Sequence, residues 1–165
     1  MKESNFVKLI KKNVTIYNWF RIETTTQQGF PDLIGIAPHM DTIFVECKIA
    51  KANKITLSPH QISMCLRLST IAPGKSFIIV FSEHAKLIHG AREILYETSK
   101  WQKILEKGVR EPPIAVSWPG IIEFLKKNNG LCPKKSAELR QKRGSLTIIF
   151  IIVSYISGRE PPKKR

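Results

Sequence analysis

The sequence predicts an α/β fold, because two kinds of apolar spacing alternate along its first half. Segments spaced like amphipathic helices are followed by short alternating or continuous apolar runs, which are typical of strands. The apolar content of 42% is sufficient for a packed core, and 165 residues fit one domain with an appendage. The predicted elements are a helix over 4–13, strands over 17–24, 32–37 and 42–48, a helix from 58 to about 70, and a strand over 76–81.

The third predicted strand has two chemically different faces. Because side chains alternate along a strand, Glu46 and Lys48 point the same way, with Phe44 beside them. Val45 and Cys47 point to the opposite face, which we assign to the core. A charged pair is therefore expected on one side of an otherwise apolar strand.

The helix that follows has a well-marked start. Ser58 suits the N-cap position, Pro59 the first helical position, and Gln61 stands three residues after the cap, which is the spacing of a capping box. Pro73 and Gly74 end the helix. The apolar run after this turn predicts a buried strand.

Further elements are expected beyond residue 82. They are a strand over 86–89, a helix over 91–108 and a helix over 118–129 with Pro119 in its first turn. The chain then becomes strongly basic, so we expect one body over residues 1–125 and a basic extension over 126–165. The extension contains an apolar stretch, 146–156, which we expect to form a strand or to be covered by a partner.

The charge of the chain points to a polyanionic partner. The net charge is +14, and residues 126–165 hold 11 Lys and Arg against 2 Glu, a net of +9. Nucleic acid is the common partner of such a protein, whereas a basic protein that binds none is the alternative. The residues expected to contact nucleic acid are Arg21, Lys51, Lys54, His60, Lys134, Lys135, Arg140 and Arg143.

Cysteine usage and the first residues of the chain suggest the compartment. Three cysteines far apart, without a CxxC pair, argue against a zinc site and suit a reducing environment. The start of the chain has no apolar run of a secretory signal, and the stretch over 146–156 is too short to span a bilayer. We expect an intracellular protein, in a bacterial host cytoplasm or another DNA-containing compartment, that is neither secreted nor membrane-bound.

The most informative residues form two short motifs, Pro31-Asp32 and Glu46-x-Lys48. Glu46 lies within an apolar strand, where a buried charge needs a partner or a metal. Two carboxylates suit Mg²⁺, which prefers carboxylate oxygens, water and phosphate oxygens. A nearby ammonium can hold a water molecule that attacks a phosphodiester. A turn aspartate and a surface Glu–Lys pair are the structural alternatives.

These motifs resemble the active-site signature of the PD-(D/E)XK nuclease superfamily. The chain is similar to small phage-type nucleases, in particular the virus-type replication-repair nucleases (VRR-NUC) near the Holliday-junction resolvase-like branch. The similarity covers roughly residues 15–82. It rests on the order of Arg21-Ile22-Glu23-Thr24, Gly29-Phe30-Pro31-Asp32-Leu33, Phe44-Val45-Glu46-Cys47-Lys48, Leu57-Ser58-Pro59-His60-Gln61 and Phe77-Ile78-Ile79-Val80-Phe81.

The resemblance implies a restriction-endonuclease-like αβββαβ core with a mixed central sheet and added C-terminal helices, and a nuclease domain over residues 1–125. It implies Mg²⁺ as cofactor, with Mn²⁺ able to substitute, and products with 5′-phosphate ends. Asp32, Glu46 and the main-chain carbonyl of Cys47 would bind the metal, and Lys48 would position the attacking water.

Two further side chains each have a functional and a structural explanation. By resemblance, Gln61 lies at the active site, although its capping role alone would explain it. Glu23 is the expected additional acidic residue, but a structural pair with Arg21 would also account for it. Glu3, on the first helix, is the competing candidate.

The function expected is a metal-dependent DNA endonuclease, selective for junctions or flaps in viral DNA replication, recombination or repair. A homing or restriction-like site-specific endonuclease is one alternative, and a non-catalytic nucleic-acid-binding protein on the same fold is another. Because cutting both strands takes two active sites, a homodimer or higher homo-oligomer is expected. A third alternative is a subunit of a larger assembly.

Overall fold

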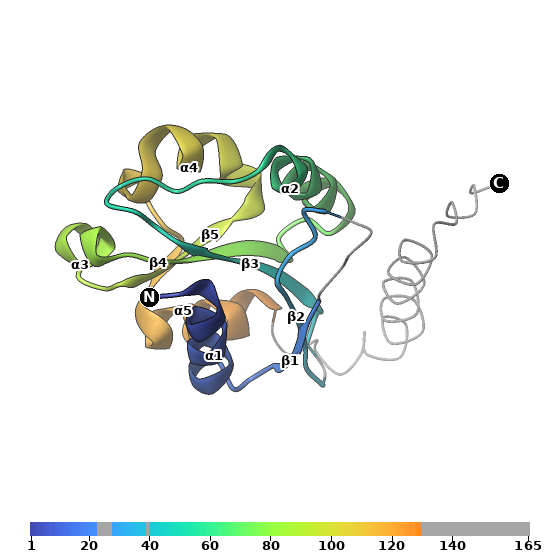
Figure 1. Ribbon diagram of the computed structural model, residues 1–165. Coiled ribbons are helices and arrows are strands. Elements are labelled where there is room, and N and C mark those ends of the chain that lie inside the picture. The colour runs from blue at the N-terminus through green and yellow to red at the C-terminus, as the bar shows by residue number, and fades with distance from the viewer. Residues whose placement is uncertain (23–27, 39, 130–165) are drawn as a thin grey trace. The chain divides into compact units, whose positions relative to one another are not determined.

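A six-stranded mixed sheet runs through the computed structural model, which describes residues 1–22, 28–38 and 40–129 (Figure 1). The strands are β1 (Asn18–Arg21), β2 (Leu33–Ile36), β3 (Ile43–Ile49), β4 (Ser76–Phe81), β5 (Glu93–Glu97) and β6 (Ala115–Val116), and they lie in the sheet in that order. Only β3 and β4 pair in parallel, and the other neighbours are antiparallel. The predicted mixed sheet is confirmed.

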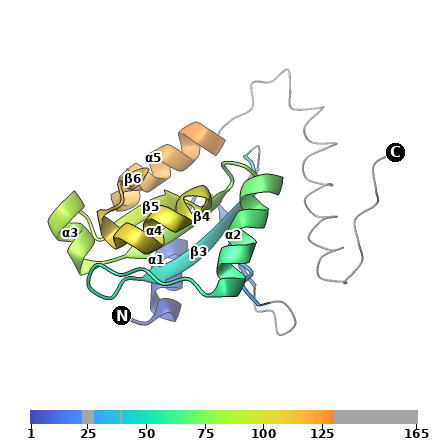
Figure 2. The same ribbon diagram turned by 90° about the horizontal axis from the view of Figure 1, so that it is seen from above.

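Helices cover both faces of this sheet (Figures 1 and 2). The helices are α1 (Glu3–Asn13), α2 (Pro59–Ile71), α3 (Glu83–His89), α4 (Trp101–Lys107) and α5 (Ser117–Asn129), with short 3₁₀ turns η1 (Thr98–Lys100) and η2 (Gly108–Arg110). Helices α1 and α5 lie on one face, and α2, α3 and α4 lie on the other.

Each face of the sheet has its own hydrophobic core. On the α1 and α5 side, Phe6 and Ile10 of α1 and Leu125 of α5 belong to one core with Val45 and Cys47 of β3, all of them buried. On the other side, the core consists of Ile55, Cys65, Ile78, Val80, Ala85, Ile94, Tyr96, Ile104 and Val109. Strands β3 and β4 are thus covered on both faces, which is the usual condition of a parallel pair.

The elements predicted for residues 4–81 are confirmed in type and order. The strand expected over 17–24 is β1, which begins at Asn18 and ends at Arg21, and residues 23–27 lie outside the described part. The capping box is present in full: the Ser58 hydroxyl accepts from the Gln61 backbone N–H at 3.2 Å, and the Gln61 side chain accepts from the Ser58 N–H at 2.9 Å. The αβββαβ core is therefore α1-β1-β2-β3-α2-β4.

Two predictions beyond residue 82 are wrong. Residues 86–89 belong to helix α3, because the Ser82 hydroxyl caps its first turn and Gly90, at φ +78°, ends it. The helix expected over 91–108 begins only at Trp101, since residues 93–97 form strand β5. The backbone of β5 pairs with β4, and this long-range pairing outweighs the helical spacing of Ile94 and Leu95.

The predicted division of the chain stays a prediction. Residues 1–130 form one compact unit, and α5 continues to Asn129. The rest of the basic extension, with its apolar stretch over 146–156, lies outside the described residues. Within the described part, no helix is long and apolar enough to cross a membrane.

Candidate active site

The two sequence motifs meet where the start of β2 lies beside the second half of β3. Asp32 immediately precedes β2, which pairs with β3 in the register Leu33 to Val45. One carboxylate oxygen of Asp32 accepts the backbone N–H of Cys47 at 2.8 Å. On β3, Lys48 Nζ contacts Glu46 Oε1 at 2.9 Å. The antiparallel pairing therefore brings both carboxylates and the amine to one place.

Glu46 is a buried carboxyl group, with 3% of its surface exposed. Burial, followed by the negative charge of Asp32, raises its pKa to about 7, although Lys48 acts in the opposite direction. The net shift shows that the attraction of Lys48 does not compensate for desolvation and for the second carboxylate. The site is therefore short of positive charge, which is the condition that a bound cation relieves.

Lys48 is held in its charged form by these acids. Its side chain is 14% exposed, and burial by itself would lower its pKa. The contact with Glu46, followed by the charges of Glu3 and Asp32, reverses that effect, and the pKa is raised above the usual value. The amine is therefore protonated at neutral pH, so it can donate hydrogen bonds.

Gln61 links the first turn of α2 to Glu46. Its side-chain oxygen faces the Ser58 N–H, which can only donate, so its NH₂ group must point the other way. That NH₂ group donates a hydrogen bond to Glu46 Oε1, the oxygen that also contacts Lys48. One side chain thus closes the capping box and also holds the buried carboxylate, while its role at an active site stays a prediction.

Gly29 explains why a glycine precedes the Pro31-Asp32 motif. Its φ is +89°, and a Cβ atom there would lie 2.4 Å from the main-chain carbonyl carbon and oxygen of His60. Only glycine allows this close approach. The loop before Asp32 therefore packs directly on the first turn of α2, which holds Gln61. The sequence motif contains this glycine, but no local pattern reveals its contact with His60.

Glu3 is the acidic residue that the structure brings to this site. It opens α1, and its charge is close enough to raise the pKa of both Glu46 and Lys48. An acid in the first turn of a helix is also favoured by the helix dipole, so its position alone did not reveal the site. Glu23, which the sequence analysis preferred, lies outside the described residues.

The residues expected to contact nucleic acid are placed only in part. Arg21 ends β1, His60 lies in the first turn of α2, and Lys51 and Lys54 pair across a tight turn after β3. All four are exposed. The predicted contacts Lys134, Lys135, Arg140 and Arg143 lie outside the described residues.

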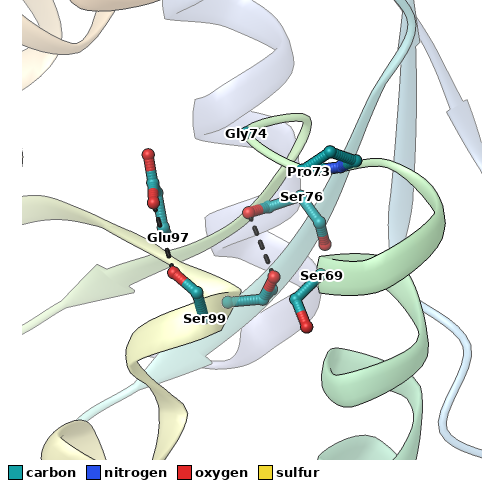
Figure 3. Close-up of a pocket in the computed structure, with 7 residues that line it drawn as sticks. Ser69, Pro73, Gly74, Ser76, Glu97 and Ser99 are labelled. Atoms are coloured by element: carbon teal, nitrogen blue, oxygen red, sulfur yellow. Dashed lines mark hydrogen bonds between the residues drawn. The ribbon is translucent and has the colours of Figure 1, made fainter.

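A small pocket of about 140 Å³ lies apart from this site (Figure 3). It is found where α2 ends and β4 begins, and it is lined by Ser69, Pro73, Gly74, Ser76, Glu97, Thr98 and Ser99. None of the predicted site residues lines it. The candidate active site is thus an arrangement of side chains near the start of α2, at the opposite end of that helix.

The oxygen donors present fit a divalent cation. Among the described residues, no group of three or more His, Cys, Asp or Glu side chains is arranged to hold a metal ion. The carboxylates of Asp32 and Glu46 are hard oxygen donors, and their mutual repulsion raises the pKa of Glu46. Two carboxylates with remaining positions filled by water and phosphate are the set that Mg²⁺ uses in phosphate chemistry.

Comparison with known proteins identifies the family. Residues 17–109, more than half of the chain, match the family model of the archaeal Holliday junction resolvases (Hjc). The match runs from just before β1 to η2 and includes Asp32, Glu46, Lys48 and Gln61, whereas Glu3 precedes it. A comparison with curated proteins found no match. The narrower likeness to the virus-type replication-repair nucleases stays a prediction. The fold, the site and this match together show that the chain belongs to the archaeal Holliday junction resolvase family, within the PD-(D/E)XK nuclease superfamily.

Proposed function

We propose that the protein is a divalent-metal-dependent endonuclease that cuts four-way DNA junctions. The family supports a nuclease that acts on such junctions. The observation that carries the metal dependence is Glu46, a buried carboxylate next to a second carboxylate, with a pKa raised to about 7. A side chain in this state is a poor structural element but a good cation ligand.

Asp32, Glu46 and the Cys47 carbonyl are the groups that would hold Mg²⁺, with Mn²⁺ able to substitute, and Glu3 is a further acidic group nearby. When bound, such an ion polarises the scissile phosphate and lowers the pKa of water. The proposal replaces Glu23 with Glu3 as the additional acid, because only Glu3 has a described effect on the site.

The side chains of the protein orient the reactants. Lys48 carries a charged amine that can donate both to the attacking water and to phosphate oxygens, where negative charge builds up during the reaction. Gln61 holds one oxygen of Glu46 through its NH₂ group. The Cys47 N–H does the same for Asp32. Each carboxylate is thereby pre-oriented, and hydrolysis would leave 5′-phosphate ends.

A homodimer is the assembly that suits this function. Resolution of a four-way junction needs two cuts in opposed strands, and one site of this kind makes one cut. A two-fold axis places two identical sites symmetrically. The basic extension, with Lys134, Lys135, Arg140 and Arg143, is proposed as an additional arm that grips DNA phosphates.

The first test compares substrates and a variant with near-identical shape. The purified protein is incubated with a synthetic four-way junction, a linear duplex of the same sequence and a supercoiled plasmid, with and without Mg²⁺, beside Glu46→Gln. Mg²⁺-dependent cutting of the junction that the variant loses supports the proposal.

The other outcomes separate the alternatives. Cutting of plasmid and duplex at fixed sequences, with no preference for the junction, would indicate a homing or restriction-like enzyme. Junction binding without cutting under any metal would indicate a non-catalytic binding protein and would contradict the proposal.

A further inference from the structure

The chain forms a tight, charged turn directly after β3. Lys51 and Lys54 are joined by two backbone hydrogen bonds, of 3.1 and 2.9 Å, which close a two-residue turn over Ala52 and Asn53. Lys48 stands only three residues before it, or about 10 Å along an extended chain. Figure 1 shows this loop continuing from the end of β3 before the chain returns to α2.

The turn holds two like charges side by side. Residues paired directly across two antiparallel strands point to the same face, where like charges repel. Both lysine side chains are exposed, and in the described part of the chain no carboxylate forms an ion pair with either of them. The arrangement is unfavourable for the isolated protein and favourable for a bound anion.

The backbone of the turn is strained in a way that glycine would avoid. Ala52 has φ +52°, in the left-handed region that disfavours residues with a Cβ atom. Turns of this length usually place glycine or asparagine at such positions. Strain of this kind persists only where the surroundings enforce it, and it is concentrated at functional sites.

The surroundings here are a close contact with η2. The Asn53 carbonyl accepts the Val109 N–H at 3.0 Å, and the Asn53 side chain donates to the Lys107 carbonyl at 3.1 Å. A Cβ atom on Gly108 would lie only 1.8 Å from the Asn53 carbonyl oxygen, so glycine is required there. The Ser82 hydroxyl donates to the Ala52 carbonyl at 3.4 Å. Two segments distant in sequence, residues 107–109 and Ser82, thus hold this turn.

We propose that this Lys51–Lys54 turn is a rigid phosphate clamp, which binds a DNA backbone phosphate next to the scissile phosphate that Lys48 contacts. The inference rests on the proposed function and adds to it a fixed second contact with the same strand. Exposed lysines on flexible loops lose freedom when they bind. A turn that is already held in place loses less, so its contacts contribute more to affinity.

The main test measures junction binding as a function of salt. Full-length protein and a fluorescent four-way junction are titrated without divalent metal, and the slope of log affinity against log salt counts released counterions. For Lys51→Gln/Lys54→Gln the slope should become shallower by about 1 to 2, since each phosphate contact contributes about 0.9. Lys11→Gln/Lys12→Gln removes the same charge from exposed positions at the far end of α1 and is the matched control.

A second variant tests the rigidity. Asn53→Ala keeps both lysines but removes the hydrogen bond to the Lys107 carbonyl. Affinity should fall roughly two- to tenfold with an unchanged salt slope, because ordering entropy and not charge is lost. A thermal melt of each variant shows that the fold is retained.

The failures can be told apart. Equal slopes for the turn variant and its control would overturn the clamp, whatever the cleavage assay shows. Unchanged affinity of Asn53→Ala would overturn its rigidity. Both tests measure binding and not cutting. A wild-type protein that binds the junction but never cuts it would therefore contradict the proposed function, while the salt-slope and affinity comparisons would still test the clamp.

Discussion

The two faces of β3 have different surroundings, a hydrophobic core on one side and the candidate active site on the other. Toward α1 and α5, Val45 and Cys47 are fully buried among apolar side chains. Toward α2, Glu46 is almost as buried, but its neighbours are Lys48, Gln61 and Asp32. Burial therefore does not distinguish core from site. The core and the site differ in the neighbours of the buried side chain, which are apolar in the core and polar or charged around Glu46.

The difference predicts that substitutions on the two faces fail in different ways. On the α1 side, truncation leaves a cavity and lowers stability, while the chemistry of the remaining folded molecules is unchanged. On the α2 side, removal of a charged group lowers activity, and stability stays the same or increases.

The largest effect is expected for Lys48→Ala. Loss of the charged donor should reduce junction cleavage by about 10²–10³-fold, as for other removed transition-state donors. Junction affinity should stay within a few fold, because phosphate contacts elsewhere remain. Single-turnover cleavage and anisotropy measure the two quantities, with Lys8→Ala, an exposed lysine of α1, as control. Unchanged cleavage would remove Lys48 from the catalytic site.

Ile10→Ala tests the apolar face. Ile10 is fully buried between α1 and the sheet, and truncation of such a side chain lowers the free energy of unfolding by about 2–5 kcal/mol. Urea denaturation measures the change. Below the unfolding midpoint, the cleavage rate per folded molecule should match the wild type. A selective loss of cleavage without loss of stability would show that the α1 face is part of the site.

Glu46→Gln should stabilise the metal-free protein at high pH. The folded-state pKa of Glu46 is about 7, above the ordinary value of 4.5, so this carboxyl contributes stability below pH 4.5 that is lost as the pH rises to 7. In EDTA the variant should therefore be more stable than wild type at pH 8, by roughly 1–3 kcal/mol, and the gain should shrink toward pH 5.

Added Mg²⁺ should make the wild type more stable than Glu46→Gln at pH 8. A ligand that binds only the folded state stabilises it, and the variant lacks one carboxylate ligand. Denaturation curves at both pH values, with and without Mg²⁺, measure the free energy of unfolding of each protein under these four conditions. A wild-type protein that Mg²⁺ does not stabilise would argue against the carboxylate pair as a cation site.

The smallest effect is expected for Gln61→Glu. Glutamate preserves the acceptor of the capping box with Ser58, so α2 should lose less than about 1 kcal/mol of stability. It removes the NH₂ donor and places a second negative charge against Glu46, so cleavage should fall by about tenfold or more. Gln61→Ala is the comparison, because it removes both the cap and the donor. Equal cleavage by Gln61→Glu and wild type would limit Gln61 to a capping role.

Much of the architecture followed from local patterns. The capping box at Ser58 marked the start of α2 to the residue, because its hydrogen bonds involve only neighbouring positions. The alternation along β3 correctly put Glu46 and Lys48 on one face. The strand β5 was missed, because its three consecutive residues Ile94, Leu95 and Tyr96 between two glutamates are too few to show a period, and the segment becomes a strand only by pairing with β4.

The sequence by itself determined the elements with local signals and the side-chain faces of β3, and it predicted that Asp32, Glu46 and Lys48 form one site. Only the tertiary structure decided that Gln61 donates to Glu46, that Gly29 packs on His60 and that Glu3 approaches the site. These interactions join residues that are 15 to 43 positions apart in the chain. They depend on how the helices pack on the strands. Spacing along the chain reports hydrogen bonds and faces within one element, whereas distances between elements are set by packing, which no local pattern encodes.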